Sequence, residues 1–94
     1  MFDRMKQMYD LQKKAREIQK KLEDIKIEES KAGIKILMNG IFKVEQLEIA
    51  PEYLSPDKKQ KLESLLCDIF TDAVKEAQKR SALESKDLLK GFSL

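Results

Sequence analysis

A run of cations near the N-terminus is the clearest candidate for chemistry in this 94-residue sequence. Lysine and arginine side chains bind phosphate groups, although a run of charges is more often the solvated face of a helix. Between residues 13 and 21 a single acidic residue, Glu17, opposes five basic ones. This excess makes phosphate binding a reasonable interpretation for the cations of the segment, which are Lys13, Lys14, Arg16, Lys20 and Lys21.

Catalytic and metal-binding chemistry find little support in the sequence. The chain has no His, the commonest general base and metal ligand, and its one Cys cannot build a zinc site. Its three glycines form no phosphate-binding loop motif. Asp68 and Asp72 are an i, i+4 pair, but lysines lie nearby and nothing in the sequence buries the carboxylates. We therefore predict a protein that is not an enzyme and uses no metal, cofactor or small-molecule substrate.

Composition predicts one domain over residues 1–94, with a flexible tail from about residue 81. Charged residues make up 38% of the chain, but 41% hydrophobic residues are too many for a disordered segment. The net charge of +2 is mild, so any basic surface must be local. Cys67 permits no intrachain disulfide, and no apolar run has the length of a membrane span or a signal peptide. We expect a cytoplasmic protein.

Residues 1–24 are predicted to form the helix that presents the cations. The segment contains no Gly or Pro, and its apolar residues recur at alternating steps of three and four. This narrow stripe, which has heptad spacing, suits one seam against a sheet or a partner helix. The cations lie off the stripe, whose members are Met5, Met8, Leu11, Ala15, Ile18, Leu22 and Ile25.

The stretch from Gly33 to Pro51 predicts a β-hairpin. Asn39-Gly40 separates two apolar-rich runs, and these residue types tolerate the positive φ that a two-residue type I′ turn requires. In that tight register one sheet face carries six apolar residues, and the other carries Leu37, Phe42 and Val44. A bulge near Glu45 or Gln46 would instead place Phe42 and Val44 with Leu47 and Ile49. The sequence leaves both registers open.

A further strand and a second helix complete the predicted fold. Residues 25–29 alternate like a strand, and Gly33 ends the turn that follows, so the sheet is a three-stranded antiparallel meander. Ser55-Pro56-Asp57 predicts a helix start, with Tyr53 and Leu54 tucked beneath the helix. A broad apolar stripe runs from Leu62 to Ala77. Cys67 lies beside it and is read as a small, half-buried side chain.

The combined pattern resembles the YbaB/EbfC family of bacterial nucleoid-associated proteins. The resemblance rests on Ile34-x-Ile36-x-Met38-Asn39-Gly40 and then Val44-x-x-Leu47-x-Ile49-x-Pro51. It continues through the second helix, covers the chain to about Arg80, and is specific through the order of its motifs. The chain departs from the family pattern after the Asn-Gly turn, where apolar residues stand in place of basic or polar ones.

The resemblance implies an α+β homodimer (helix, three strands, helix) that binds duplex DNA in the nucleoid. We expect phosphate contacts from the five cations of the first helix, with Lys79 and Arg80 as a secondary cluster. Leu37, Phe42 and Val44 are predicted at the dimer interface, because an exposed apolar patch invites a partner. The alternative is a dimeric adaptor whose apolar stripes bind a protein and whose charges only solvate it.

Overall fold

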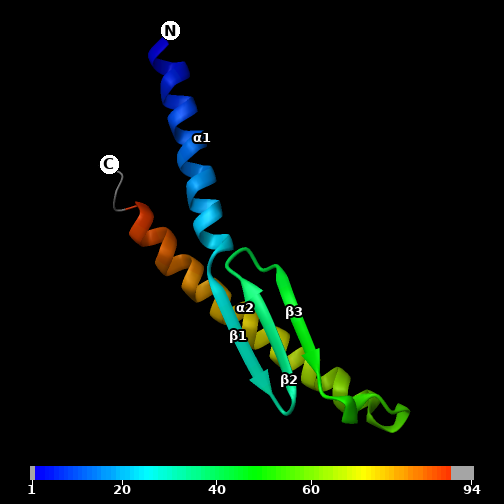
Figure 1. Cartoon of the computed structure of the whole chain (residues 1–94). Helices are drawn as coiled ribbons and strands as arrows, with labels where there is room; N and C mark the ends of the chain where they lie inside the picture. Colours follow the sequence, from blue (N-terminus) through cyan, green and yellow to red (C-terminus); the bar gives the residue numbers. More distant parts are fainter. Residues whose placement is uncertain (1, 90–94) are drawn as a thin grey trace.

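The chain folds as a helix, a three-stranded sheet and a second, longer helix (Figure 1). The computed structural model describes residues 2–89. This order of elements confirms the predicted α+β class. The elements are α1 (Phe2–Glu23), β1 (Lys26–Lys31), β2 (Ile34–Asn39), β3 (Val44–Ile49), two short 3-10 turns (Pro51–Tyr53 and Pro56–Lys58) and α2 (Lys59–Leu89).

Helix α1 projects beyond the end of the sheet and diverges from the last turns of α2 (Figure 1). Its bounds agree with the prediction, but its apolar stripe is largely unpacked among residues 2–89. Met5, Met8 and Leu11 are exposed, and only Ile18 and Leu22 near the end of the helix are half-buried. Within the described part of the chain, the seam predicted along α1 is therefore covered only over its last turns. Neither described helix is long and apolar enough to cross a membrane.

The sheet is an antiparallel meander in the order β1-β2-β3, and a bulge sets its register. Leu37 pairs with Gln46 whereas Met38 pairs with Val44, so Glu45 has no partner on β2. The tight two-residue register across Asn39-Gly40 is therefore wrong. The alternative with a bulge near Glu45 is confirmed for Val44, which lies with Leu47 and Ile49, but not for Phe42, which lies in the turn. A bulge of this kind places two residues of one strand opposite one of the other.

The turn before β3 depends on the side chain of Asn39 rather than on a positive φ at this residue. Asn39 Oδ1 accepts hydrogen bonds from the backbone N–H groups of Ile41 and Lys43, both at 3.0 Å. Positive φ occurs at Phe42 (67°), not at Asn39 or Gly40. The φ values of a type I′ turn appear instead in the β1–β2 hairpin, where Ala32 (51°) and Gly33 (87°) are both positive.

The bulge sorts the side chains of the sheet into an apolar and a polar face. Ile27, Ile34, Ile36 and Met38 are buried on the face that packs against α2. Val44 shares this face with its partner Met38, whereas Leu37 lies on the opposite face between polar partners, Glu28 and Gln46. The predicted grouping of Leu37 with Val44 on one face is therefore wrong, and Phe42 lies in the turn.

The apolar stripe of α2 confirms the predicted core helix. Ile69, Ala73 and Ala77 are buried, and the other apolar members of the stripe are half-buried against the core. Tyr53 is also buried, and its hydroxyl donates a hydrogen bond to the carbonyl oxygen of Ala32. Leu54 is exposed, contrary to prediction, and so is Cys67. The helix continues through Leu89, so the segment predicted to become a tail is helical from residue 81 to that point, and residues 90–94 lie outside the described part of the chain.

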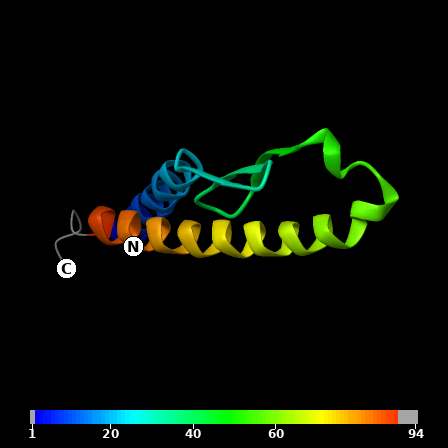
Figure 2. The same cartoon turned by 90° about the horizontal axis from the view of Figure 1, so that it is seen from below.

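Helix α2 covers only part of the apolar face of the sheet. Figure 2 shows the sheet lying over one side of α2. The ammonium of Lys31 on β1 lies 3.5 Å from the carboxylate of Asp68, so β1 lies over that side of the helix. On β3, by contrast, Val44 and Leu47 remain 39% and 40% exposed although they point to the core face. The β3 end of the core is therefore open.

Candidate nucleic-acid interface

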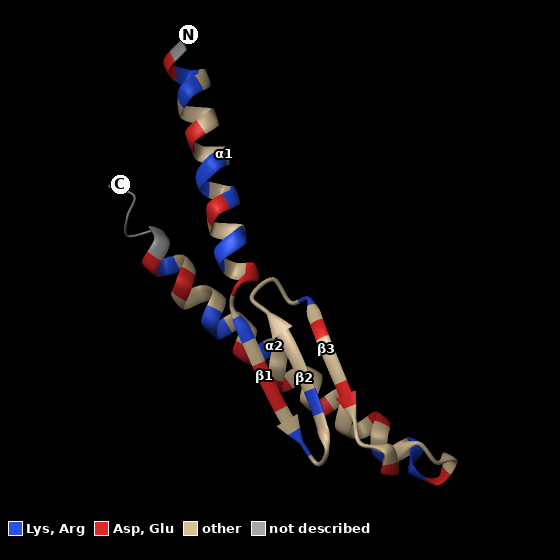
Figure 3. Ribbon diagram, viewed as in Figure 1, with Lys and Arg blue, Asp and Glu red and all other residues tan. Residues whose placement is uncertain are grey.

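Positive charge in this chain is concentrated on α1. The helix carries seven basic and four acidic residues, a net +3, whereas the remaining residues carry 12 basic and 13 acidic ones, a net −1. Figure 3 shows Lys and Arg recurring along the whole of α1. The sequence predicted that any basic surface must be local. This surface lies on the projecting helix α1.

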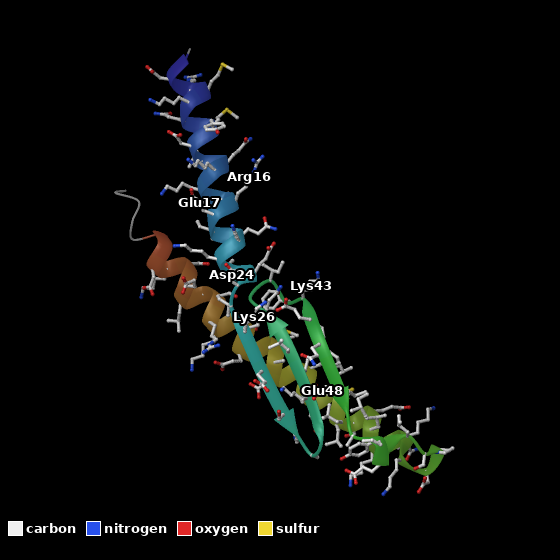
Figure 4. The ribbon with its side chains drawn as sticks, in the orientation of Figure 1. Arg16, Glu17, Asp24, Lys26, Lys43 and Glu48 are labelled. Atoms are coloured by element: carbon white, nitrogen blue, oxygen red, sulfur yellow. The ribbon has the colours of Figure 1, made fainter. Side chains whose placement is uncertain are left out.

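The five predicted cations divide between two sides of α1. At about 100° per residue, Lys13, Arg16 and Lys20 fall within about 60° of one another. Lys14 and Lys21 lie roughly a third of a turn away, on the side that also carries acidic residues. There the Lys14 ammonium lies 4.0 Å from the carboxylate of Glu17, and Figure 4 shows Arg16 and Glu17 pointing to opposite sides of the helix. The structure thus brings together three of the five.

The side with Lys13, Arg16 and Lys20 is open to solvent. Lys13 and Arg16 line a shallow hollow with Tyr9 and Gln12. Among the residues whose side chains are described, 3–87, none of the three cations forms an ion pair. No carboxylate among these residues therefore lies within ion-pair distance of the three charges. We call Lys13, Arg16 and Lys20 the basic face of α1.

The predicted secondary cluster on α2 has a different character. Lys79 is exposed. Arg80 instead donates a hydrogen bond of 2.9 Å from Nη1 to the backbone oxygen of Lys26, and its Nε lies 3.7 Å from the carboxylate of Glu76. Arg80 thus ties the start of β1 to α2. No pattern in the sequence signals this contact, because its partners are 54 residues apart.

Lysines on the sheet are paired with carboxylates. Lys26 forms an ion pair of 2.5 Å with Glu45, and Lys35 forms one of 2.7 Å with Glu28. The hydrogen bond to Glu28 raises the pKa of Lys35, and the negative charge of Glu28 adds to this effect. Figure 4 shows Lys26 and Lys43 near Asp24, at the end of α1. The sheet therefore offers no unpaired cationic surface comparable to the basic face.

Within the described residues no group of His, Cys, Asp and Glu side chains is arranged to hold a metal ion.

The fold and the charge distribution define a small α+β protein that presents a basic helix beyond a helix-covered meander. A sequence profile of the YbaB/EbfC DNA-binding family matches residues 1–92. The chain therefore belongs to the YbaB/EbfC DNA-binding family.

Individual relatives are similar over most of their length. A nucleoid-associated protein of Rhodospirillum centenum is 34% identical over 92 residues, which cover 96% of this chain and 86% of the relative. A nucleoid-associated protein of Clostridium kluyveri is 29% identical over 96 aligned residues, covering 100% of this chain and 84% of that protein. A third, from Roseiflexus castenholzii, is 35% identical over 68 residues, covering 70% of this chain and 68% of the relative. The resemblance noted in the sequence is thus confirmed.

Proposed function

We propose that this protein binds duplex DNA in the cytoplasmic nucleoid, as a homodimer, through phosphate contacts with little sequence specificity. The observation that carries the proposal is the exposed, unpaired basic face on a helix that stands clear of the sheet. Phosphate contacts position a protein on DNA but read no bases. Membership of a DNA-binding family and the names of the nucleoid-associated relatives support the same conclusion.

The proposed contacts follow the geometry of the cations. The basic face makes the main contacts because its three charges share one side of α1 and form no ion pair with a carboxylate among the described residues. Lys14 and Lys21 flank it and reach phosphates only when a strand passes along their side of the helix. Lys79 and Arg80 form a secondary cluster, in which the hydrogen bond of Arg80 to β1 limits its reach.

Salt dependence tests the binding mode directly. Binding to two unrelated duplexes is expected to be weak, equal within error, and steeply reduced by salt, because association releases counterions from the phosphates. Each phosphate contact contributes about 0.9 to the slope of log affinity against log salt on B-DNA. Fluorescence anisotropy on labelled duplexes across a salt series measures this slope. A strong preference for one duplex, or no binding at low salt, contradicts the proposal.

The open end of the core supports the homodimer. On α2, Phe70 and Val74 lie on the flank away from Asp68, hence toward β3, and both are half-buried. Together with Val44 and Leu47 they form an apolar surface that the described chain does not cover. Exposed apolar patches of this kind mark interaction sites. We propose that a second copy covers it. Three residues were predicted from the sequence to lie at the dimer interface. Of these, Val44 belongs to this surface, Phe42 lies in the turn before β3, and Leu37 is on the opposite face of the sheet.

A matched pair of substitutions tests which face of the sheet forms the dimer. Leu47→Asp is expected to yield monomers, because it places a carboxylate in the buried centre of the proposed interface. Leu37→Asp puts the same group on the polar face and is expected to leave the dimer intact. Sedimentation equilibrium at micromolar concentrations distinguishes the two. Monomers from Leu37→Asp, or dimers from Leu47→Asp, would assign the interface to the other face.

The adaptor function is supported by one separate observation. The outer half of the apolar stripe on α1, with Met5, Met8 and Leu11, is exposed. Such a stripe fits the groove of a partner protein. If the protein binds neither duplex at any salt concentration while it remains a folded dimer, the adaptor replaces DNA binding as the proposed function.

A further inference from the structure

The direction of α1 is set almost entirely at its last turn. Residues 3–17 are exposed, so no packing within the described chain holds this part of the helix. Only Asp24 and Ile25 connect α1 to β1. Whatever orients the basic face relative to the sheet must therefore act at the end of α1.

Three residues from different elements meet at that point. The N–H of Gly40, in the turn before β3, donates a hydrogen bond of 2.9 Å to the carbonyl oxygen of Leu22 in α1. The hydroxyl of Ser81 in α2 donates one of 2.6 Å to the carbonyl oxygen of Gly40. Gly40 is buried and Ser81 is half-buried. We call Leu22, Gly40 and Ser81 the arm junction.

The arm junction leaves no room for a side chain at position 40. A Cβ atom on Gly40 would lie 2.4 Å from the oxygen of Leu22 and 3.0 Å from the hydroxyl oxygen of Ser81. The φ of Gly40 is not positive, so close approach rather than backbone conformation is what requires glycine here. Leu22 O also accepts from the N–H of Ile25 at 3.2 Å. The last turn of α1 is thereby tied to the sheet and, through Ser81, to α2.

We propose that Gly40 and Ser81 are positioning residues for DNA binding. Gly40 holds the Leu22 carbonyl and Ser81 holds Gly40, and together they fix the direction of α1 and place its basic face on the phosphates. The inference rests on the proposed function, but neither residue needs to contact DNA. In a homodimer the two arm junctions would set the spacing between two basic faces. A change in direction then reduces the number of phosphates contacted at once.

Two substitutions loosen the arm junction in different ways. Gly40→Ala forces the Leu22 carbonyl away, and Ser81→Ala removes one hydrogen bond without adding an atom. Ser85→Ala is the matched control, since Ser85 lies one turn further along α2 and is half-buried, and its hydroxyl makes no hydrogen bond among the described residues. If Gly40→Ala fails to fold, Ser81→Ala decides the question alone.

Spin labels report the direction of α1 independently of DNA. Exposed Cys67 on α2 provides one label, and Gln7→Cys on α1, also exposed, provides the other. Chains labelled at both sites are diluted with unlabelled Cys67→Ser chains, so that pulsed dipolar spectroscopy measures distances within one chain. The parent and Ser85→Ala are expected to give one narrow distribution, and the two junction variants a broader or displaced one.

The salt slope separates positioning from a merely structural role. An unstable variant has fewer competent molecules, which lowers apparent affinity but leaves the slope unchanged. A misdirected α1 loses phosphate contacts, so the slope is expected to fall by about 0.9 or more. Parent-like distances or parent-like slopes in the junction variants overturn the inference. A parent that binds no DNA contradicts the proposed function, and the distances still show whether the junction fixes α1.

Discussion

Replacing Lys13, Arg16 and Lys20 together by Glu is expected to abolish DNA binding while leaving the protein folded. All three side chains are exposed and unpaired within the described residues, so their reversal removes no ion pair or side-chain hydrogen bond there. It also places carboxylates where phosphates would approach, which adds repulsion to the lost attraction. Anisotropy at low salt measures the binding, and circular dichroism with sedimentation checks the fold and the association state.

A second triple variant controls for total charge. Lys58, Lys59 and Lys61 lie at the opposite end of the molecule, near the start of α2, and are exposed. Either set of three Lys/Arg→Glu changes takes the formal net charge from +2 to −4. The control is expected to weaken binding much less, because the proposed phosphate contacts lie on α1. Equal losses from both variants would show that overall charge, rather than the basic face, governs binding.

Truncation of Ile69 to Ala is expected to destabilise the fold more than any other single truncation on α2. Ile69 is 1% exposed and lies in the core cluster with Ile34, Ile36 and Ala73. Removing a large side chain there leaves a cavity, which costs about 2–5 kcal/mol. The half-buried Leu66 should cost less in the same substitution. Chemical denaturation at a fixed protein concentration measures the free energy of unfolding, since the stability of the proposed dimer would depend on concentration.

Cys67→Ser serves as the neighbouring control for this series. The thiol is exposed, and surface substitutions usually change stability by no more than about 0.5 kcal/mol. A loss from Cys67→Ser or Leu66→Ala equal to that from Ile69→Ala would mean that α2 packs with a different side toward the sheet. The three values together fix the rotation of the helix.

The sequence predicted what depends on near neighbours. The stripes on α1 and α2 follow from a period of about 3.6 residues, and the bounds of α1 agreed closely with its pattern. The Asn39-Gly40 pair led to a wrong turn prediction because neither residue has the positive φ that usually explains this pair in a hairpin. Asn39 instead accepts two backbone hydrogen bonds, and Gly40 fits beneath the carbonyl of Leu22. The pattern of residue types is the same for either cause, so it could not distinguish the two registers.

In the candidate site, too, the features that depend on residues close in sequence were predictable and those that depend on distant residues were not. The cations of the first helix were visible because they are close in sequence, and their division between two sides of α1 follows from helical geometry. The role of Arg80 was not visible, because its guanidinium binds a carbonyl on β1. Nor could the pattern show that the bulge separates Leu37 from Val44, since a shift of one residue exchanges the faces of a strand.

The exposed, unsupported course of α1 has a mechanical consequence. At about 1.5 Å per residue, its 22 residues make a rod of about 33 Å. A rotation of about 10° at the fixed end therefore displaces the free tip by about 6 Å, which exceeds the 3.4 Å spacing of charges along one DNA strand. A small rotation at Leu22 would thus produce a much larger displacement at the far end of the helix. If the arm junction directs α1 as proposed above, substitutions at Gly40 or Ser81 displace charges at the far end of the helix that they do not contact.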